Sequence, residues 1–103
     1  MKLIWSPEAV AQFEAILDFI GARSPANAEK WGREFLSAIK KVAPFPESGR
    51  AIPEHGDEIL REWLIGKYRG AYIVSDSGVK IVAVWHGAKR SPGRGVRGEI
   101  DDE

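Results

Sequence analysis

The sequence predicts a single α+β domain in which a short strand and an antiparallel helical hairpin precede a three-stranded antiparallel meander. Two Ser-Pro pairs each open a segment whose apolar residues recur at helical spacing. Three later runs are rich in β-branched and aromatic residues and are separated by short turns that contain glycine. The length of 103 residues suits one domain, and 44% apolar residues are enough to form a core.

The first strand is expected over residues 2–5, because Ile4 and Trp5 favour extended structure. Ser6 suits a helix N-cap and Pro7 suits the first helical position, where its missing N–H costs nothing. The helix is expected to end near Gly21. Its apolar face is predicted from five residues at helical spacing: Val10, Phe13, Ile16, Leu17 and Ile20. Four polar residues lie away from that face: Glu8, Gln12, Glu14 and Asp18.

The second helix is predicted to begin at Ser24-Pro25 and to stop before Pro44. Only about three residues separate the two helical segments, and so short a connection favours an antiparallel hairpin. Gly32 is expected to allow a close approach to the first helix. The apolar face consists of six residues: Ala28, Trp31, Phe35, Ala38, Ile39 and Val42.

The segment 43–58 holds three prolines and two glycines, so it is expected to be a loop without a continuous helix or central strand. Strands are predicted over residues 59–65, 68–75 and 79–86, and the short turns between them indicate an antiparallel meander. In the last strand, simple alternation places one set of residues on one face: Val79, Ile81, Ala83 and Trp85. It places a second set on the other: Lys80, Val82, Val84 and His86.

The charges are unevenly distributed along a chain whose formal net charge is zero. Residues 59–98 carry 8 basic and 2 acidic side chains, for a net +6, and residues 99–103 carry 4 acidic side chains. The basic segment suggests an anionic partner, while the pI of 6.7 argues against general polyanion binding. Residues 91–103 lack periodicity and are expected to form a mobile tail behind a domain at 1–90.

Several classes of protein are excluded by composition. The chain has no cysteine, which excludes a disulfide scaffold, a cysteine nucleophile and a thiolate metal site. No apolar run approaches the length that spans a membrane, and the apolar start is too short for a secretory signal. We therefore expect a cytoplasmic protein without a membrane partner.

Short motifs throughout the chain carry a family resemblance. They are Trp5-Ser6-Pro7-Glu8-Ala9, Ser24-Pro25, Phe45-Pro46-Glu47-Ser48-Gly49-Arg50, Pro53-Glu54, Arg61-Glu62, Tyr68-Arg69 with Tyr72, and His86-Gly87-Ala88-Lys89-Arg90. In this order they resemble the ParE/RelE superfamily of toxin–antitoxin toxins, and most of all its ParE branch, over about residues 2–90.

The ParE resemblance implies a toxin that inhibits DNA gyrase by binding and that uses no cofactor and no metal. It also implies a cognate ParD-like antitoxin, which we expect to bring an acidic amphipathic C-terminal segment, and no sequence-specific contact with nucleic acid. Six residues are the candidates for contacts with the target or the antitoxin: Arg50, Arg61, Arg69, His86, Lys89 and Arg90.

RelE-like members of the superfamily cleave mRNA on the ribosome, and this alternative stays open. In the RelE pattern, Arg69 and Arg90 match two arginines, but residues 60–62 contain no lysine and no tyrosine follows Arg90. In the related YoeB-like pattern, Glu54 or Glu47 would act with Arg69 and with His86 as the acid. A third alternative is a family member that binds its antitoxin and is no longer toxic.

Structural roles compete with these functional ones. Arg61 is as well placed to pair across the sheet, and Arg69 to bond carbonyls of the Pro/Gly loop. A histidine at a strand end, such as His86, is more often structural than catalytic.

Overall fold

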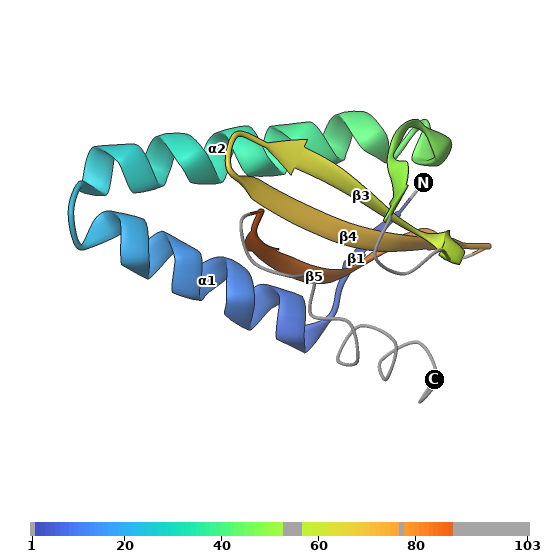
Figure 1. Ribbon diagram of the computed structural model, residues 1–103, viewed down its shortest axis with the longest axis horizontal. Helices are drawn as coiled ribbons and strands as arrows, with labels where there is room; N and C mark the ends of the chain where they lie inside the picture. Colours follow the sequence, from blue (N-terminus) through green and yellow to red (C-terminus); the bar gives the residue numbers. More distant parts are fainter. Residues whose placement is uncertain (1, 53–56, 77, 88–103) are drawn as a thin grey trace.

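The computed structural model of the chain has two antiparallel helices packed against one face of a five-stranded sheet (Figure 1). It describes residues 2–52, 57–76 and 78–87. The sheet order is β1-β5-β4-β3-β2, so the first strand lies at one edge beside the last. This arrangement confirms the predicted α+β fold.

Both helices begin at the Ser-Pro pairs, as the sequence predicts. β1 (Leu3–Trp5) leads into α1 (Pro7–Gly21), and α2 (Pro25–Val42) follows after a tight turn. The Ser6 hydroxyl accepts a hydrogen bond from the Ala9 N–H at 3.0 Å, and the Ser24 hydroxyl accepts one from the Asn27 N–H at 3.1 Å. Each serine thereby satisfies an N–H that has no partner within its helix.

The predicted apolar face of α1 is only partly right. Ala9 is the fully buried residue of this helix, whereas Val10 keeps 38% of its surface exposed. Gln12, which was placed away from the core, reaches the last strand of the sheet instead. In α2 the prediction is confirmed at Phe35 and Ile39, which are buried.

The three predicted strands form the antiparallel meander. They are β3 (Asp57–Ile65), β4 (Tyr68–Ser75) and β5 (Gly78–His86). β3 begins two residues earlier than expected. The turn between β3 and β4 contains Gly66 at φ +55°, a left-handed conformation that glycine adopts without steric cost.

The Pro/Gly segment is more ordered than a plain loop. It forms a 3₁₀ turn, η1 (Pro46–Ser48), and a short edge strand, β2 (Arg50–Ile52), which pairs antiparallel with β3. At the opposite edge, β1 pairs parallel to β5 through three residue pairs, from Leu3 with Val79 to Trp5 with Ile81.

A bulge in β5 overturns the predicted alternation of its faces. Ala71 of β4 pairs with Ala83, but the next residue, Tyr72, pairs with Ile81, so one extra residue is inserted in β5. On the C-terminal side of the inserted residue, the β5 side chains therefore point to the opposite faces from those that simple alternation predicts. Val84 therefore joins Ile81 in the core under the helices, although the sequence placed them on opposite faces.

The core under the helices is largely aromatic. Phe35 lies 5.1 Å from Trp31 and 4.9 Å from Trp63, measured between ring centroids. A second apolar cluster lies on the other face of the sheet: Leu60, Ala71, Val82, Ala83 and Trp85. The sheet is therefore apolar on both faces. Neither helix is long and apolar enough to span a membrane, as judged from the described residues.

Candidate functional site

Several of the predicted site residues lie beyond what the structure can test. Glu54, Lys89 and Arg90 fall outside the described residues. Arg50 is described in its backbone only, which pairs with Glu62 across the β2–β3 ladder. Glu47 lies exposed in η1.

Arg61 and Tyr72 are neighbours on β3 and β4 and hold the Pro/Gly segment in place. Arg61 donates to the Gly49 carbonyl at 2.8 Å and to the Glu47 carbonyl at 3.4 Å. The Tyr72 hydroxyl donates to the Pro46 carbonyl at 2.6 Å and accepts from the Gly49 N–H at 3.0 Å. Arg61 therefore uses hydrogen bonds to fix this segment, which is a structural role.

The environment of Tyr72 keeps its hydroxyl protonated. Burial raises the pKa of Tyr72 above its ordinary value of 10.0, because a phenolate is poorly solvated there. The Gly49 N–H and the positive charge of Arg61 act in the opposite direction and offset part of that effect. A protonated hydroxyl is needed, since only this form donates to the Pro46 carbonyl.

Arg69 is committed to an ion pair inside the protein. Its Nε and one terminal nitrogen approach the same carboxylate oxygen of Glu62, at 2.8 Å and 2.5 Å. The Glu62 side chain is fully buried. The guanidinium also lies over the Trp85 ring, 4.9 Å from its centroid. The cation therefore has a carboxylate and an aromatic face as neighbours on the sheet face away from the helices.

His86 lies on the opposite face of the sheet from Arg69. Its ring packs edge-to-face on Tyr68, with 5.1 Å between the ring centroids. The Tyr68 ring packs in the same way on Trp31 of α2, with 5.0 Å between the centroids. Tyr68 and Arg69 are consecutive in β4, so their side chains point to opposite faces. The structure thus does not bring together Arg69 and His86, the described arginine and histidine of the ribonuclease alternative.

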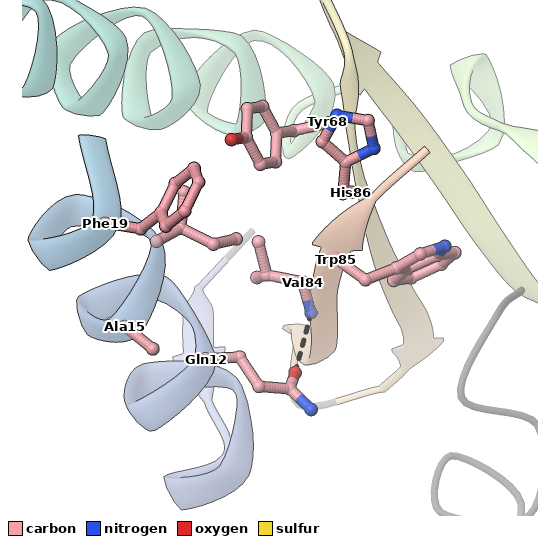
Figure 2. Close-up of a pocket in the computed structure, with 8 residues that line it drawn as sticks. Gln12, Ala15, Phe19, Tyr68, Val84, Trp85 and His86 are labelled. Carbon is pink, nitrogen blue, oxygen red and sulfur yellow. Dashed lines mark hydrogen bonds between the residues drawn. The ribbon is translucent and has the colours of Figure 1, made fainter. Parts of the chain in front are cut away.

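A groove runs between α1 and the end of β5 (Figure 2). Its volume is about 390 Å³. The α1 side is a stripe at helical spacing: Gln12, Ala15, Ile16 and Phe19. The sheet side consists of Tyr68, Val84, Trp85 and His86. Gln12 crosses the groove, and its side-chain oxygen accepts from the Val84 N–H at 2.8 Å.

The groove residues on α1 were missed by reasoning from the sequence. Phe19 lies off the predicted apolar stripe, and 64% of its surface is exposed. Gln12 is classed as polar and outward by periodicity alone. One signal was present: α1 carries apolar residues around most of its circumference, which is typical of a helix with a second contact surface.

Among the side chains that the structure describes, no group of three or more His, Asp or Glu residues converges. What the described site offers is a groove with an apolar lining, a strand edge beside it, and cations engaged with protein groups.

Comparisons with known proteins identify the family and, separately, a shared fold. The family model described as ParE toxin of type II toxin-antitoxin system, parDE, matches residues 3–90. Toxin RelE2 from Caulobacter vibrioides is 31% identical over 88 residues, covering 85% of this chain and 97% of that protein. A solved structure of the chromosomal ParDE TA system from P. aeruginosa shares the fold, with a TM-score of 0.69 and 19% identity over 84% of this chain and 95% of that one. The chain therefore belongs to the ParE toxin family of type II toxin–antitoxin systems.

Proposed function

We propose that this toxin inhibits DNA gyrase in the cytoplasm by binding it, without chemistry of its own, and that a cognate ParD-like antitoxin neutralises it. The observation that carries the first part is the separation of Arg69 from His86. Arg69 pairs with Glu62 on one face of the sheet, and His86 packs on Tyr68 on the other.

Cleavage of RNA without a metal needs an acid, a base and cations that converge on one phosphate. A cation on the far side of a sheet from the acid cannot contribute to the same transition state. A binding role makes no such demand, because it needs surface shape and charge but no acid–base pair. The arrangement of these two residues therefore favours binding over catalysis.

The exposed apolar surface of α1 supports an antitoxin partner. Phe19 remains 64% exposed in a groove that is lined mostly by apolar groups, and Val10 remains 38% exposed elsewhere on the helix. Exposed apolar surface of this kind marks protein contact sites. An acidic amphipathic segment of the antitoxin would bury these side chains and meet the basic residues of the sheet half.

Two assays with the purified full chain test the proposal. In the first, the toxin is incubated with DNA gyrase and relaxed plasmid, and supercoiling and trapped cleaved plasmid are measured. In the second, it is incubated with translating ribosomes, and cuts in the mRNA are mapped. We expect loss of supercoiling with accumulation of cleaved plasmid and no mRNA cuts. Absence of both activities would contradict the proposal and leave a protein that only binds its antitoxin.

One observation favours a second candidate, ribosome-dependent mRNA cleavage: the relative at 31% identity is named Toxin RelE2. His86→Ala separates the two candidates. If gyrase inhibition is the activity, this variant still traps cleaved plasmid, weakened at most by the loss of one candidate target contact. If mRNA cleavage is the activity, the variant loses it while remaining folded. Lys67→Ala, in the nearby turn, is the matched control for a change of surface charge.

A further inference from the structure

We propose that the C-terminal segment 88–103 folds back over the sheet face away from the helices and covers it in the isolated toxin. The segment lies outside the described residues, so the proposal rests on the described residues of that face. It replaces the mobile tail that the lack of periodicity in residues 91–103 predicts. A molecule that binds Arg69 or Trp85 must first displace the segment, so the contact is autoinhibitory.

The sheet face away from the helices is buried, although both described α-helices pack on the opposite face (Figure 1). Each member of its apolar cluster is at most 7% exposed: Leu60, Ala71, Val82, Ala83 and Trp85. The carboxylate of Glu62 on the same face is fully buried as well. An antiparallel sheet face that is open to water carries mainly polar side chains and leaves them accessible. This face is therefore covered.

The cover has a boundary on β3. Leu64 shares a face with Leu60 and Glu62, because side chains two residues apart in a regular strand point the same way. Leu60 and Glu62 are buried, whereas Leu64 is 51% exposed. The face is therefore covered over its middle and open on β3 beside the β3–β4 turn.

The burial is a property of the single chain, so the cover needs no second molecule. Outside the described ranges, the chain offers residues 53–56 and 88–103, and the single residues 1 and 77. Residues 53–56 join Ile52 to Asp57, which pair with each other in β2 and β3. So short a connection does not reach β5, which lies three strands, or about 14 Å, from β2. The segment 88–103 is the remaining candidate.

The segment 88–103 has the starting point and the length that this face requires. The Gly87 N–H donates to the Lys67 carbonyl, so the segment starts at the end of the sheet that holds the β3–β4 turn. Its sixteen residues can extend over roughly 50 Å, whereas crossing from β5 to β3 takes about 10 Å. Three of its apolar residues are spaced four apart, and we expect them to lie over the cluster: Pro92, Val96 and Ile100.

The Trp85 indole indicates a polar contact with the segment. Trp85 points away from α1 (Figure 2), and within the described part of the chain its buried Nε1–H has no acceptor. A buried donor without an acceptor is destabilising, so most such donors in folded proteins are paired. The indoles of Trp31 and Trp63 also lack an acceptor there, but they lie among the rings under the helices. We expect a carbonyl or carboxylate of the segment to accept from Trp85.

The chain has no cysteine, so a single introduced thiol can report on each face. Val82→Cys places a thiol on the covered face and Val84→Cys places one under the helices, and both valines are 2% exposed in the same strand. Leu64→Cys is the open reference. The reaction of each full chain with a disulfide reagent is timed without denaturant. We expect Val82→Cys to react at least about tenfold more slowly than Leu64→Cys, and equal rates would overturn the proposal.

The double substitution Val96→Asp/Ile100→Asp, added to each thiol variant, tests whether the segment is the cover. Carboxylates do not pack on an apolar cluster, so Val82→Cys should then react about tenfold faster while Val84→Cys keeps its slow rate. Ala11→Asp/Ala26→Asp adds two acids at exposed helical positions and should change neither rate. An unchanged rate at Val82→Cys, or an equal acceleration at Val84→Cys, would contradict selective covering.

Hydrogen exchange of the indole protons gives a second readout in a chain that keeps all its valines on β5. The Trp85 indole proton should be protected in the unmodified chain and exchange faster in Val96→Asp/Ile100→Asp, while that of Trp31 stays unchanged. If the protection of Trp85 increases with protein concentration, a second copy provides the cover and the proposal is wrong.

Neither measurement uses gyrase or ribosomes, so this proposal and the proposed function fail separately. A toxin that cuts mRNA would still carry the cover if Val82→Cys is protected by the segment. A face that proves open in solution would remove the autoinhibitory contact and leave gyrase inhibition untouched.

Discussion

The guanidinium of Arg69 faces a carboxylate from which water is excluded. The two charges attract each other strongly because the surroundings are apolar. If one of them is removed, the other stays buried without compensation for its lost hydration, which destabilises the fold. The Trp85 ring on the flat side of Arg69 adds to this attraction. We therefore assign the effects of Arg69 substitutions to folding before any contact with a target.

Replacement of Arg69 by leucine should reduce the free energy of unfolding by about 3 kcal/mol, because Glu62 stays buried without the cation it faces. The double variant Arg69→Leu/Glu62→Leu should regain much of that loss, since no buried carboxylate remains. Urea unfolding followed by circular dichroism measures both. Equal losses in the single and double variants would show that the ion pair is not the cause.

The raised pKa of Tyr72 predicts that the free energy of unfolding decreases at alkaline pH. The unfolded tyrosine loses its proton near pH 10, whereas the folded one retains it to higher pH because burial raises its pKa. The stability due to the protonated hydroxyl is thus fully present below pH 10 and is lost as the pH rises towards the folded-state pKa.

Tyr72→Phe should remove that alkaline loss and cost about 1 to 3 kcal/mol at neutral pH, because the Gly49 N–H and the Pro46 carbonyl lose their partner. Tyr68→Phe, which changes the other tyrosine of the chain, is the control and should retain the alkaline loss. Thermal unfolding between pH 7 and pH 11 gives both results.

At this scale the sequence indicates residue types more reliably than residue roles. It identified Arg61 and Arg69 as notable cations, but the acceptors that engage them come from strands and loops paired only in the folded state. It named a structural alternative for each arginine, yet the partner of Arg69 proved to be Glu62 and the loop carbonyls bind Arg61. These contacts join residues on different strands and loops, and no periodic pattern in the sequence indicates such pairs.

Among the elements, the helices follow most directly from local signals. Ser6-Pro7 and Ser24-Pro25 start both helices at the predicted residues, because capping depends on near neighbours. The bulge in β5 was not predictable in this way, since one inserted residue reverses the faces without any turn residue to mark it. Because of this reversal Val84 faces α1 and lines the groove, so the groove could not be predicted from simple alternation.

The two caps should differ in their contribution to stability. Ser6 is buried and also contacts the Val82 carbonyl, whereas Ser24 serves only its own helix at a more exposed site. Ser6→Ala should therefore cost about 2 kcal/mol and Ser24→Ala about 1 kcal/mol. Denaturant midpoints of the two variants give the comparison, and a larger loss for Ser24→Ala would contradict it.

In the whole molecule, one layer of helices leaves α1 with an apolar side that the sheet does not cover. Phe19 is the most exposed part of that side next to the groove. Phe19→Ser should change stability by less than about 0.5 kcal/mol, since the ring is already largely in water. It should nonetheless weaken neutralisation by the antitoxin, which a growth assay with both proteins expressed would detect. Full neutralisation of this variant would place the contact elsewhere.

The parallel pairing of β1 with β5 ties the beginning of the chain to nearly the end of the described fold. Leu3 is synthesised long before Val79, with a delay of about four to fifteen seconds at ordinary rates of synthesis. During that time the first strand has no ladder to join, although both helices have been made. The sheet can therefore close at its β1 edge only after nearly all of the described fold has been translated.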